Sequence, residues 1–306
     1  MTAGPALIVA AAAAPLTVFA WVKYRLRSVG DDPTFGAAPG FVAALAGGAV
    51  IGPIVAIASY GIAALVAGFL VQGLVEPGRA LLRQLGADPS LTGVMRSTWV
   101  LVLLIELVVI APLTEEAGKA LGGRLGKPMD RRAAFLCGVA AGTGFAIVEN
   151  MVYGWGAVSF GAAWEPVIAT RVFCAAMHPL ATGLVMLGWW DWRENRDPAA
   201  LARGYLAGVG VHALWNGAQV AMIVVVASSS ASRGVITFAA LAFTGALGVV
   251  MMGALWRLTD VVAAGGEVRA GALSEPKAMA GWILLSSTML VPVAFVAFLF
   301  PEFLGS

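Results

Sequence analysis

Long apolar stretches alternate with short polar segments along nearly the whole chain. A helix of about 20 mostly apolar residues can cross a bilayer. Eight stretches meet this condition: Pro5–Val22, Phe41–Val75, Thr98–Leu121, Ala133–Trp155, Trp164–Trp190, Ala199–Ala227, Val235–Leu258 and Met279–Phe300. The segments between them leave no room for a soluble domain. The pattern therefore predicts an all-α fold, a polytopic membrane helix bundle of about eight transmembrane helices, with residues 1–306 forming a single transmembrane domain.

The composition supports a membrane protein. Hydrophobic types make up 60% of the 306 residues and charged types 12%, about half the share that is usual in soluble domains. This balance excludes an ordinary soluble enzyme and a disordered chain. The net charge of +2, without any basic run, predicts no nucleic-acid partner. The lipid bilayer is the expected partner.

Basic residues fall in alternate loops between the predicted spans. They follow the first span, at Lys23, and then gather near 124–132, 193–203 and 257–277. Because Lys and Arg favour cytoplasmic loops, this alternation predicts that both termini lie outside, with an uncleaved first span. The loop 76–96 carries three arginines against the pattern and is interpreted as holding an interfacial helix. Two spans split at Pro53 are the alternative to one long helix over residues 41–75.

Ionisable residues lie inside several predicted spans. Each costs about 2.5–3.5 kcal/mol at the bilayer centre, so they are expected to face the bundle interior. The third to sixth spans, about residues 98–227, carry the residues of interest and are the expected catalytic core. These residues are Glu106, Glu115, Glu116, Lys119, Glu149, Asn150, Arg171, His178, His212 and Asn216. We interpret Glu106 as a separate polar contact.

The third span carries an acidic pair and a lysine on one helix face. Lys119 follows Glu115 by four residues and Glu116 by three, so its side chain can reach either carboxylate. Two neighbouring carboxylates in a low dielectric do not both ionise easily, which suits a general acid or base. The alternative is a solvated charge cluster at the end of the helix.

The fourth span repeats a polar or aromatic residue every four positions. Phe145, Glu149 and Tyr153 therefore share one face. Glu149 has no cation in its own helix, so it needs a partner from another helix, a metal ion or a proton. The alternative is a protonated structural glutamate.

Both histidines of the chain lie inside predicted spans. Arg171 and His178 are seven residues apart and share a face, and Pro179 is expected to disturb the helix beside them. His212 and Asn216 are four apart and share another. Two imidazoles with several carboxylates are the residue set for a divalent metal or an activated water, although each ring could instead make an interhelical hydrogen bond. Cys174 beside His178 is interpreted as an apolar filler rather than a thiol nucleophile.

Four elements follow one another on consecutive spans: Glu115-Glu116-x-x-Lys119, Phe145-x-x-x-Glu149-Asn150-x-x-Tyr153, His178 and His212-x-x-x-Asn216. In this order they resemble the PrsW family of intramembrane proteases, which is similar to the type II CAAX prenyl endopeptidases and the bacteriocin-processing enzymes. The resemblance implies a hydrolase, an intramembrane metalloendopeptidase of a bacterial-type plasma membrane. Its expected substrates are membrane proteins of the kind of an anti-sigma factor.

The resemblance also implies a role for each residue of the four elements. The catalytic set is Glu115, Glu116 and Asn216, in which the acidic pair activates water and the amide holds the substrate carbonyl. A divalent metal, Zn²⁺ first, is expected on Glu149, His178 and His212. The supporting residues are Lys119, Phe145, Asn150, Tyr153 and Arg171.

The glycine-rich segments and the intramembrane Glu and His residues give two further expectations. The glycine-rich segments 138–144 and 208–210 are expected to let a substrate helix approach closely. A non-enzymatic membrane scaffold, or a transporter linked to protons or metal ions, is the alternative function, since intramembrane Glu and His relays suit transporters equally.

Overall fold

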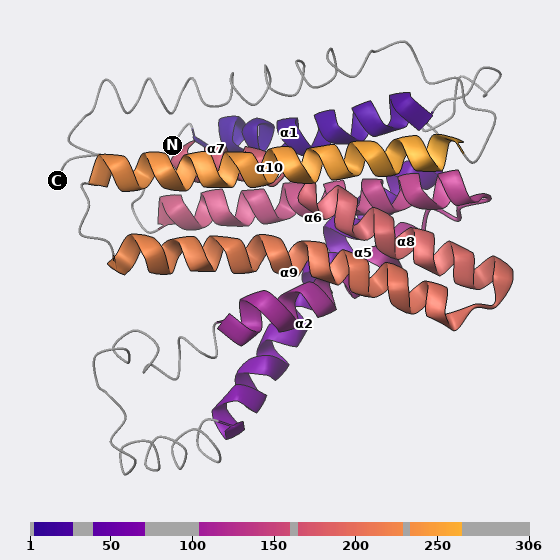
Figure 1. The fold of residues 1–306 in the computed structure, drawn as a ribbon, viewed down its shortest axis with the longest axis horizontal. Helices are drawn as coiled ribbons and strands as arrows, with labels where there is room; N and C mark the ends of the chain where they lie inside the picture. Colours follow the sequence, from indigo (N-terminus) through magenta and orange to yellow (C-terminus); the bar gives the residue numbers. More distant parts are fainter. Residues whose placement is uncertain (1–2, 27–38, 71–103, 160–164, 229–232, 265–306) are drawn as a thin grey trace.

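The computed structural model describes residues 3–26, 39–70, 104–159, 165–228 and 233–264, and each element in these ranges is helical. Figure 1 shows the arrangement. The elements are α1 (Ala3–Leu26), α2 (Pro39–Leu70), the π-helix η3 (Glu106–Ile110), α5 (Ala111–Arg124), α6 (Arg131–Ser159), α7 (Glu165–Phe173), α8 (Met177–Asn195), α9 (Pro198–Ser228) and α10 (Arg233–Ala264).

The helical membrane bundle that the sequence predicts is confirmed. Within the described ranges, five helical stretches are long and apolar enough to cross a membrane: Leu7–Leu26, Gly40–Gly61, Arg131–Ser159, Thr170–Asn195 and Phe238–Ala264. α2 continues without a break through Pro53, as the interpretation of one long helix predicts. The last predicted span, 279–300, and the loop 76–96 lie outside the described residues, so the count of about eight stays a prediction.

The fifth predicted span is interrupted. A turn at residues 174–176 separates α7 from α8, so the break lies before His178 and not after Pro179. Pro179 is the third residue of α8. Its missing N–H costs little there, because the first N–H groups of a helix have no partner within the helix. The break thus places His178 in the first turn of a new helix.

A π-helical turn lies inside the third predicted span, directly before α5 and its Pro112. Pro112 has no N–H for the carbonyl four residues earlier, and the N–H of Ala111 bonds instead to the oxygen of Glu106, five residues back. Such insertions are frequent at functional sites. The turn widens the helix immediately before the acidic pair.

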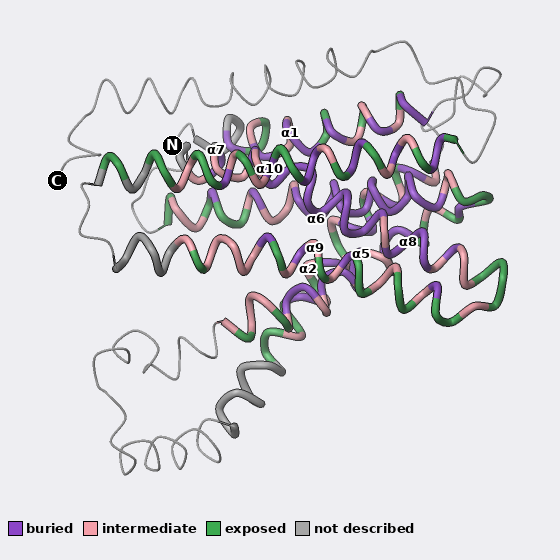
Figure 2. The backbone as a smooth tube through the Cα atoms, viewed as in Figure 1, coloured by how far each residue is buried: buried purple, intermediate pink, exposed green. Residues whose placement is uncertain are grey.

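The core of the bundle lies where α5, α6 and α8 meet the other helices. α1 packs against α6 and α10, while α8 and α9 form an antiparallel hairpin (Figure 1). Buried residues concentrate on α6 and α8, and α2 crosses the bundle obliquely with much of its surface exposed (Figure 2). Glycines let backbones touch here: a Cβ added at Gly144 would lie 2.0 Å from the oxygen of Leu45. This contact brings α2 directly onto α6.

Candidate active site

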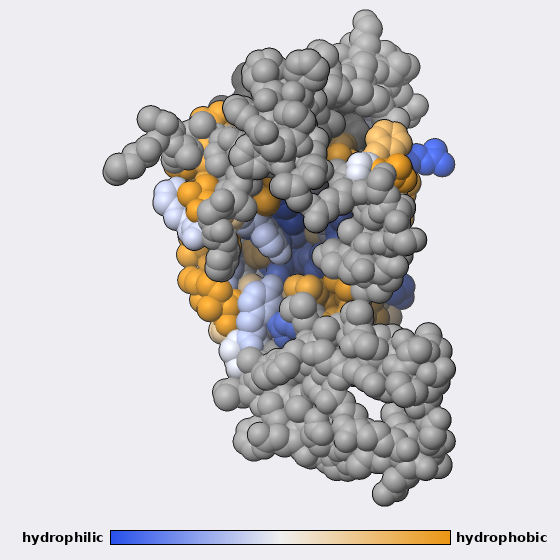
Figure 3. Space-filling model, turned by 90° about the vertical axis from the view of Figure 1, so that its left-hand side faces the viewer, coloured by the Kyte–Doolittle hydropathy of each residue, from blue (hydrophilic) through white to orange (hydrophobic). Residues whose placement is uncertain are grey.

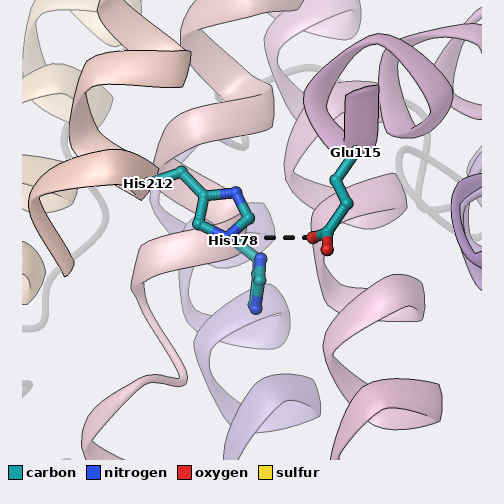
Figure 4. Close-up of side chains that lie close together, drawn as sticks. All are labelled: Glu115, His178 and His212. Carbon is teal, nitrogen blue, oxygen red and sulfur yellow. Dashed lines mark ion pairs between the residues drawn. The ribbon is translucent and has the colours of Figure 1, made fainter. Parts of the chain in front are cut away.

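Three side chains from three helices point toward one another near the centre of the bundle. Glu115 comes from α5, His178 from α8 and His212 from α9, as Figure 4 shows. Each offers one ligand atom, and these atoms lie within 4.8 Å of one another. All three residues are buried, and the two imidazole rings meet edge to face with their centroids 5.0 Å apart.

Local backbone contacts fix the position of His178. A Cβ added at Gly142 of α6 would lie only 2.4 Å from the carbonyl oxygen of His178, so only a glycine allows this approach. The ring of Phe145, one turn further along α6, lies 5.1 Å from the His178 ring, measured between centroids. α6 therefore supplies the wall against which His178 rests.

His212 is oriented by the second glutamate of the acidic pair. Its Nδ1 lies 2.9 Å from Oε1 of Glu116, and its Nε2 lies 3.8 Å from Oε2 of Glu115. A carboxylate only accepts, so Nδ1 carries the hydrogen of the neutral ring. The Nε2 lone pair is then the one that faces Glu115.

His178 is held in the same way by different partners. Its Nδ1 lies 2.9 Å from Nζ of Lys119, and its Nε2 lies 2.7 Å from Oε2 of Glu149. An ammonium group only donates, so Nδ1 accepts this hydrogen bond and Nε2 donates to Glu149. Each imidazole thus gives its N–H to a carboxylate and turns its other nitrogen toward the centre.

Lys119 places a positive charge at this centre. Its side chain is fully buried, and Nζ lies 2.7 Å from Oε1 of Glu116 and 3.3 Å from Oε2 of Glu115. The ammonium also lies 4.0 Å from the centroid of the Phe145 ring. The spacing of three and four residues that the sequence analysis used therefore brings Lys119 to both carboxylates.

The two glutamates of the pair differ in how their oxygens are satisfied. Glu116 is fully buried, with Oε1 bonded to Lys119 and Oε2 accepting from the hydroxyl of Thr182 at 2.8 Å. In Glu115, Oε1 accepts from the hydroxyl of Tyr60 at 2.5 Å. No hydrogen bond from a described residue reaches Oε2 of Glu115. Glu115 therefore carries the free oxygen of the acidic pair.

A second set of polar residues lies next to the acidic pair, Lys119 and the two histidines, and contacts them at His178. The guanidinium of Arg171, on α7, makes a close ion pair with Oε2 of Glu149, and its Nε donates to Oδ1 of Asn150 at 2.8 Å. The amide of Asn150 in turn donates a hydrogen bond to the carbonyl of Ala11 at 3.0 Å. Tyr153 lies under the guanidinium, 4.8 Å from ring centroid to Cζ. Glu149 and Arg171 are only partly buried.

We name Glu115, Glu116, Lys119 and His212 the inner cluster. We name Glu149, Asn150, Tyr153 and Arg171 the outer cluster. His178 belongs to neither and contacts both, through Lys119 and Glu149. The structure thus brings most of the sequence-predicted site residues together, and Glu149 lies on the outer side of His178.

Asn216 lies away from the inner cluster. Its Nδ2 donates to the carbonyl of Leu107 at 2.8 Å, within the π-helix η3. Glu106 begins the same π-helix, and among the described residues its Oε1 has no hydrogen-bond partner. The shared face of His212 and Asn216 on α9 therefore connects the inner cluster to the π-helical turn of the third predicted span.

Sequence reasoning did not find Tyr60 and Thr182. Both lie in mostly apolar stretches, and the sequence carries no motif around either of them. Some of the glycines that the sequence predicts to face a substrate helix instead allow helices of the bundle to pack closely. A Cβ added at Gly138 would lie 2.6 Å from the oxygen of Thr182, and one at Gly208 would lie 2.5 Å from the oxygen of Ala181. Neighbouring helices therefore occupy the space beside Gly138 and Gly208, whereas a Cβ added at Gly210 would meet no described atom within 4 Å.

The donor set at the centre fits a divalent metal ion. Two imidazole nitrogens and one carboxylate oxygen form a usual ligand set of catalytic zinc sites. Oε2 of Glu115 is a buried acceptor without a hydrogen bond from a described residue, and the ligand atoms of all three residues lie within 4.8 Å of one another. The ammonium of Lys119 already lies beside two of these three ligand atoms, so a metal ion there would share the space with Lys119.

Figure 3 shows hydrophilic side chains set among hydrophobic ones at one end of the described bundle. The part of the site that keeps some exposure is the outer cluster, where the side chains of Arg171 and Glu149 are 15% and 19% exposed. The outer cluster is therefore the less enclosed part of the site.

Comparison with known protein families places the chain. The model of the PrsW family intramembrane metalloprotease matches residues 42–247, two thirds of the sequence. The chain belongs to the PrsW family. It is thus an integral multi-pass membrane protein and a hydrolase, an intramembrane metalloprotease, as the sequence resemblance implies. No curated protein and no solved structure matches the chain.

Proposed function

We propose that Glu115, His178 and His212 hold the divalent metal ion that the family implies, with Zn²⁺ as the first ion to test. The observation that carries the proposal is the convergence of three buried ligand atoms within 4.8 Å, one of them a carboxylate oxygen without a hydrogen bond. This set differs from the sequence-based hypothesis in one ligand, since Glu115 replaces Glu149. When bound, the metal would polarise the substrate carbonyl and activate a water molecule.

Glu116 and Glu149 then have matching roles around the two imidazoles. Histidine ligands commonly donate their second N–H to a carboxylate, which fixes the ring and raises its basicity. Glu116 accepts from His212, and Glu149 accepts from His178. Arg171 and Asn150 in turn hold Glu149 and the end of α7. In this proposal the outer cluster orients one ligand instead of supplying it.

Glu115 is the residue of the acidic pair that we assign to the metal ion. Its Oε2 makes no hydrogen bond with a described residue, whereas both oxygens of Glu116 already accept hydrogen bonds. Asn216 donates to Leu107, so we assign it to holding α9 against η3 rather than to binding the oxyanion.

The substrates that we propose are membrane proteins, with a membrane-spanning anti-sigma factor as one class to test. The catalytic centre lies within a bundle of apolar helices, so a peptide bond must reach it from within the bilayer. Membership in an intramembrane protease family supports the same substrate class.

We also propose that the end of the bundle that carries Arg131 and Arg193 faces the cytoplasm, with the N-terminus outside. Several loops of this end meet in space: Arg131 donates to Asp191 at 2.9 Å, and Arg193 donates to the carbonyl of Pro128 at 3.4 Å. A cysteine at Met129, which is 87% exposed, would test the orientation. Labelling of M129C by an impermeant thiol reagent added outside intact cells would contradict it.

Cleavage of a model transmembrane substrate by the purified chain tests the peptidase mechanism. We expect Glu115→Gln to weaken metal binding and to lower the rate with it, because the metal ion loses its only carboxylate ligand of the proposed set. His212→Ala should remove both metal and activity, measured by elemental analysis and by product formation. Glu194→Gln, an exposed carboxylate at the end of α8, is the matched control and should cut like the parent. Equal rates for Glu115→Gln and the parent would refute the mechanism.

A further inference from the structure

A tyrosine from α2 reaches the inner cluster although the sequence analysis places α2 outside the catalytic core. The hydroxyl of Tyr60 lies 2.5 Å from Oε1 of Glu115 and donates to it. Nothing in the four sequence elements includes this residue. Tyr60 is 36% exposed, so its ring is not required to fill the core of the bundle. Its hydrogen bond to the acidic pair therefore needs an explanation of its own.

The packing of α2 against α5 fixes where the Tyr60 hydroxyl lies. The two helices run antiparallel with their backbones in direct contact: a Cβ added at Gly47 would lie 2.6 Å from the oxygen of Gly122. Twelve residues further along α2, the hydroxyl of Ser59 donates to the hydroxyl of Thr114 at 2.9 Å. Tyr60 follows Ser59 on α2, and Glu115 follows Thr114 on α5. The register of the pair thus makes their contact a fixed feature of the bundle.

The hydrogen bond from Tyr60 makes the two oxygens of Glu115 unequal. Oε1 is held by the phenol, while Oε2 lies 3.3 Å from Nζ of Lys119 and 3.8 Å from Nε2 of His212. A carboxylate with neither oxygen held can rotate about its last bond and present either one. With Oε1 anchored to α2, Oε2 stays turned toward the two imidazoles.

We propose that Tyr60 is a positioning residue for the metal centre, which fixes the Glu115 carboxylate so that Oε2 faces the ion. This inference rests on the proposed role of Glu115 as a ligand. Removing a group that hydrogen-bonds to a metal ligand usually lowers the metal affinity by about 10–100-fold. Tyr60 would then make α2 a part of the site, so that a shift of α2 along α5 would disturb metal binding.

Metal affinity of the purified full chain is the decisive measurement. Metal-stripped protein is titrated with Zn²⁺ against a chelating dye, and Co²⁺ is used as a spectroscopic probe of the ligand geometry. We expect Tyr60→Phe to weaken Zn²⁺ binding by about 10-fold or more and to change the Co²⁺ absorption spectrum. Tyr60→Gln, whose amide can still donate, should bind Zn²⁺ more tightly than Tyr60→Phe does.

Tyr205→Phe is the matched control. Its hydroxyl also bonds to α5, at the carbonyl of Leu113, 2.6 Å away, but it touches no carboxylate. It should leave Zn²⁺ affinity and the Co²⁺ spectrum unchanged, while both variants show similar thermal unfolding. If the parent binds Zn²⁺ and Tyr60→Phe binds it equally well with the same spectrum, the role of Tyr60 is refuted and the metal centre stands. If Glu115→Gln binds Zn²⁺ as tightly as the parent, the ligand assignment itself fails, and the inference fails with it.

Discussion

The inner and outer clusters each pair glutamate with a basic side chain but satisfy the carboxylate oxygens differently. In the outer cluster Glu149 is neutralised by Arg171 and bonded to His178, so its charge is used within the protein. In the inner cluster Glu115 keeps one oxygen without a hydrogen bond although the residue is buried. Buried polar groups are nearly always satisfied, and Oε2 of Glu115 is the one such exception within the two clusters.

Burial separates the two clusters as well. Glu116 and Lys119 of the inner cluster have no exposed surface, whereas Glu149 and Arg171 of the outer cluster keep some. A buried charge that loses its partner is destabilising by several kcal/mol, while a partly exposed one can recruit water. The inner cluster should therefore dominate stability, and the outer cluster should act mainly on the metal ligand that it holds.

The largest expected effect is that of removing Lys119. Lys119→Met leaves Glu115 and Glu116 without their ammonium in a buried site, and we expect the free energy of unfolding to fall by about 3–5 kcal/mol. Denaturant unfolding in detergent micelles measures it. Arg131→Met, which breaks an exposed pair with Asp191, should cost at most about 1 kcal/mol and serves as control.

A double variant sharpens this test. Glu116→Gln combined with Lys119→Met removes one charge of each sign, so its loss should be clearly smaller than the sum of the two single losses. Additive losses would show that the two side chains contribute independently, against the ion pair at 2.7 Å.

Changes at Glu149 decide between a ligand and a group that orients one. We expect Glu149→Leu to weaken Zn²⁺ binding by about 10–100-fold, because Nε2 of His178 loses its acceptor. Glu149→Gln keeps an oxygen that can accept this hydrogen, so its affinity should fall less. Dye competition with Zn²⁺ measures both, with Glu194→Leu at the exposed end of α8 as control. A loss as complete as that of Glu115→Gln would return Glu149 to the ligand set that the resemblance implies.

Spacing along one helix was enough to predict part of this site. Lys119 does reach both glutamates, as steps of three and four residues require. Phe145 and Tyr153, which the same reasoning places on the face of Glu149, lie against the cations of the inner and outer clusters. These contacts follow from helical geometry alone, and an ordered set of such faces was enough to indicate the family.

Contacts between helices could not be predicted in the same way. Tyr60 meets Glu115 only because glycines set the register of α2 against α5, and single-helix spacing carries no information about that register. The ion pair of Glu149 with Arg171 also joins two helices, α6 and α7, so spacing within either helix could not predict it. Sequence reasoning located the polar faces, but the partners of each oxygen required the assembled bundle.

The smallest expected effect concerns a carboxylate outside both clusters. Asp197 lies in the exposed turn before α9, where its Oδ1 accepts from the N–H of Ala199 at 2.9 Å and Oδ2 accepts from Arg203 at 3.0 Å. Although the neighbouring chain removes some water from it, the hydrogen bond from Ala199 and the charge of Arg203 hold the pKa of Asp197 below its usual value of 3.8.

The sign of the pH dependence follows from this lowered pKa. A carboxylate whose pKa is lower in the folded state stabilises the fold above its unfolded pKa, and this contribution is lost as the pH falls through the folded value. We expect Asp197→Asn to lower the unfolding temperature slightly at neutral pH, and the difference from the parent to shrink below about pH 4, near the unfolded value. Thermal unfolding of both proteins across this range measures it. A difference that grows on acidification would mean that Asp197 is held in its protonated form, contrary to its hydrogen bonds.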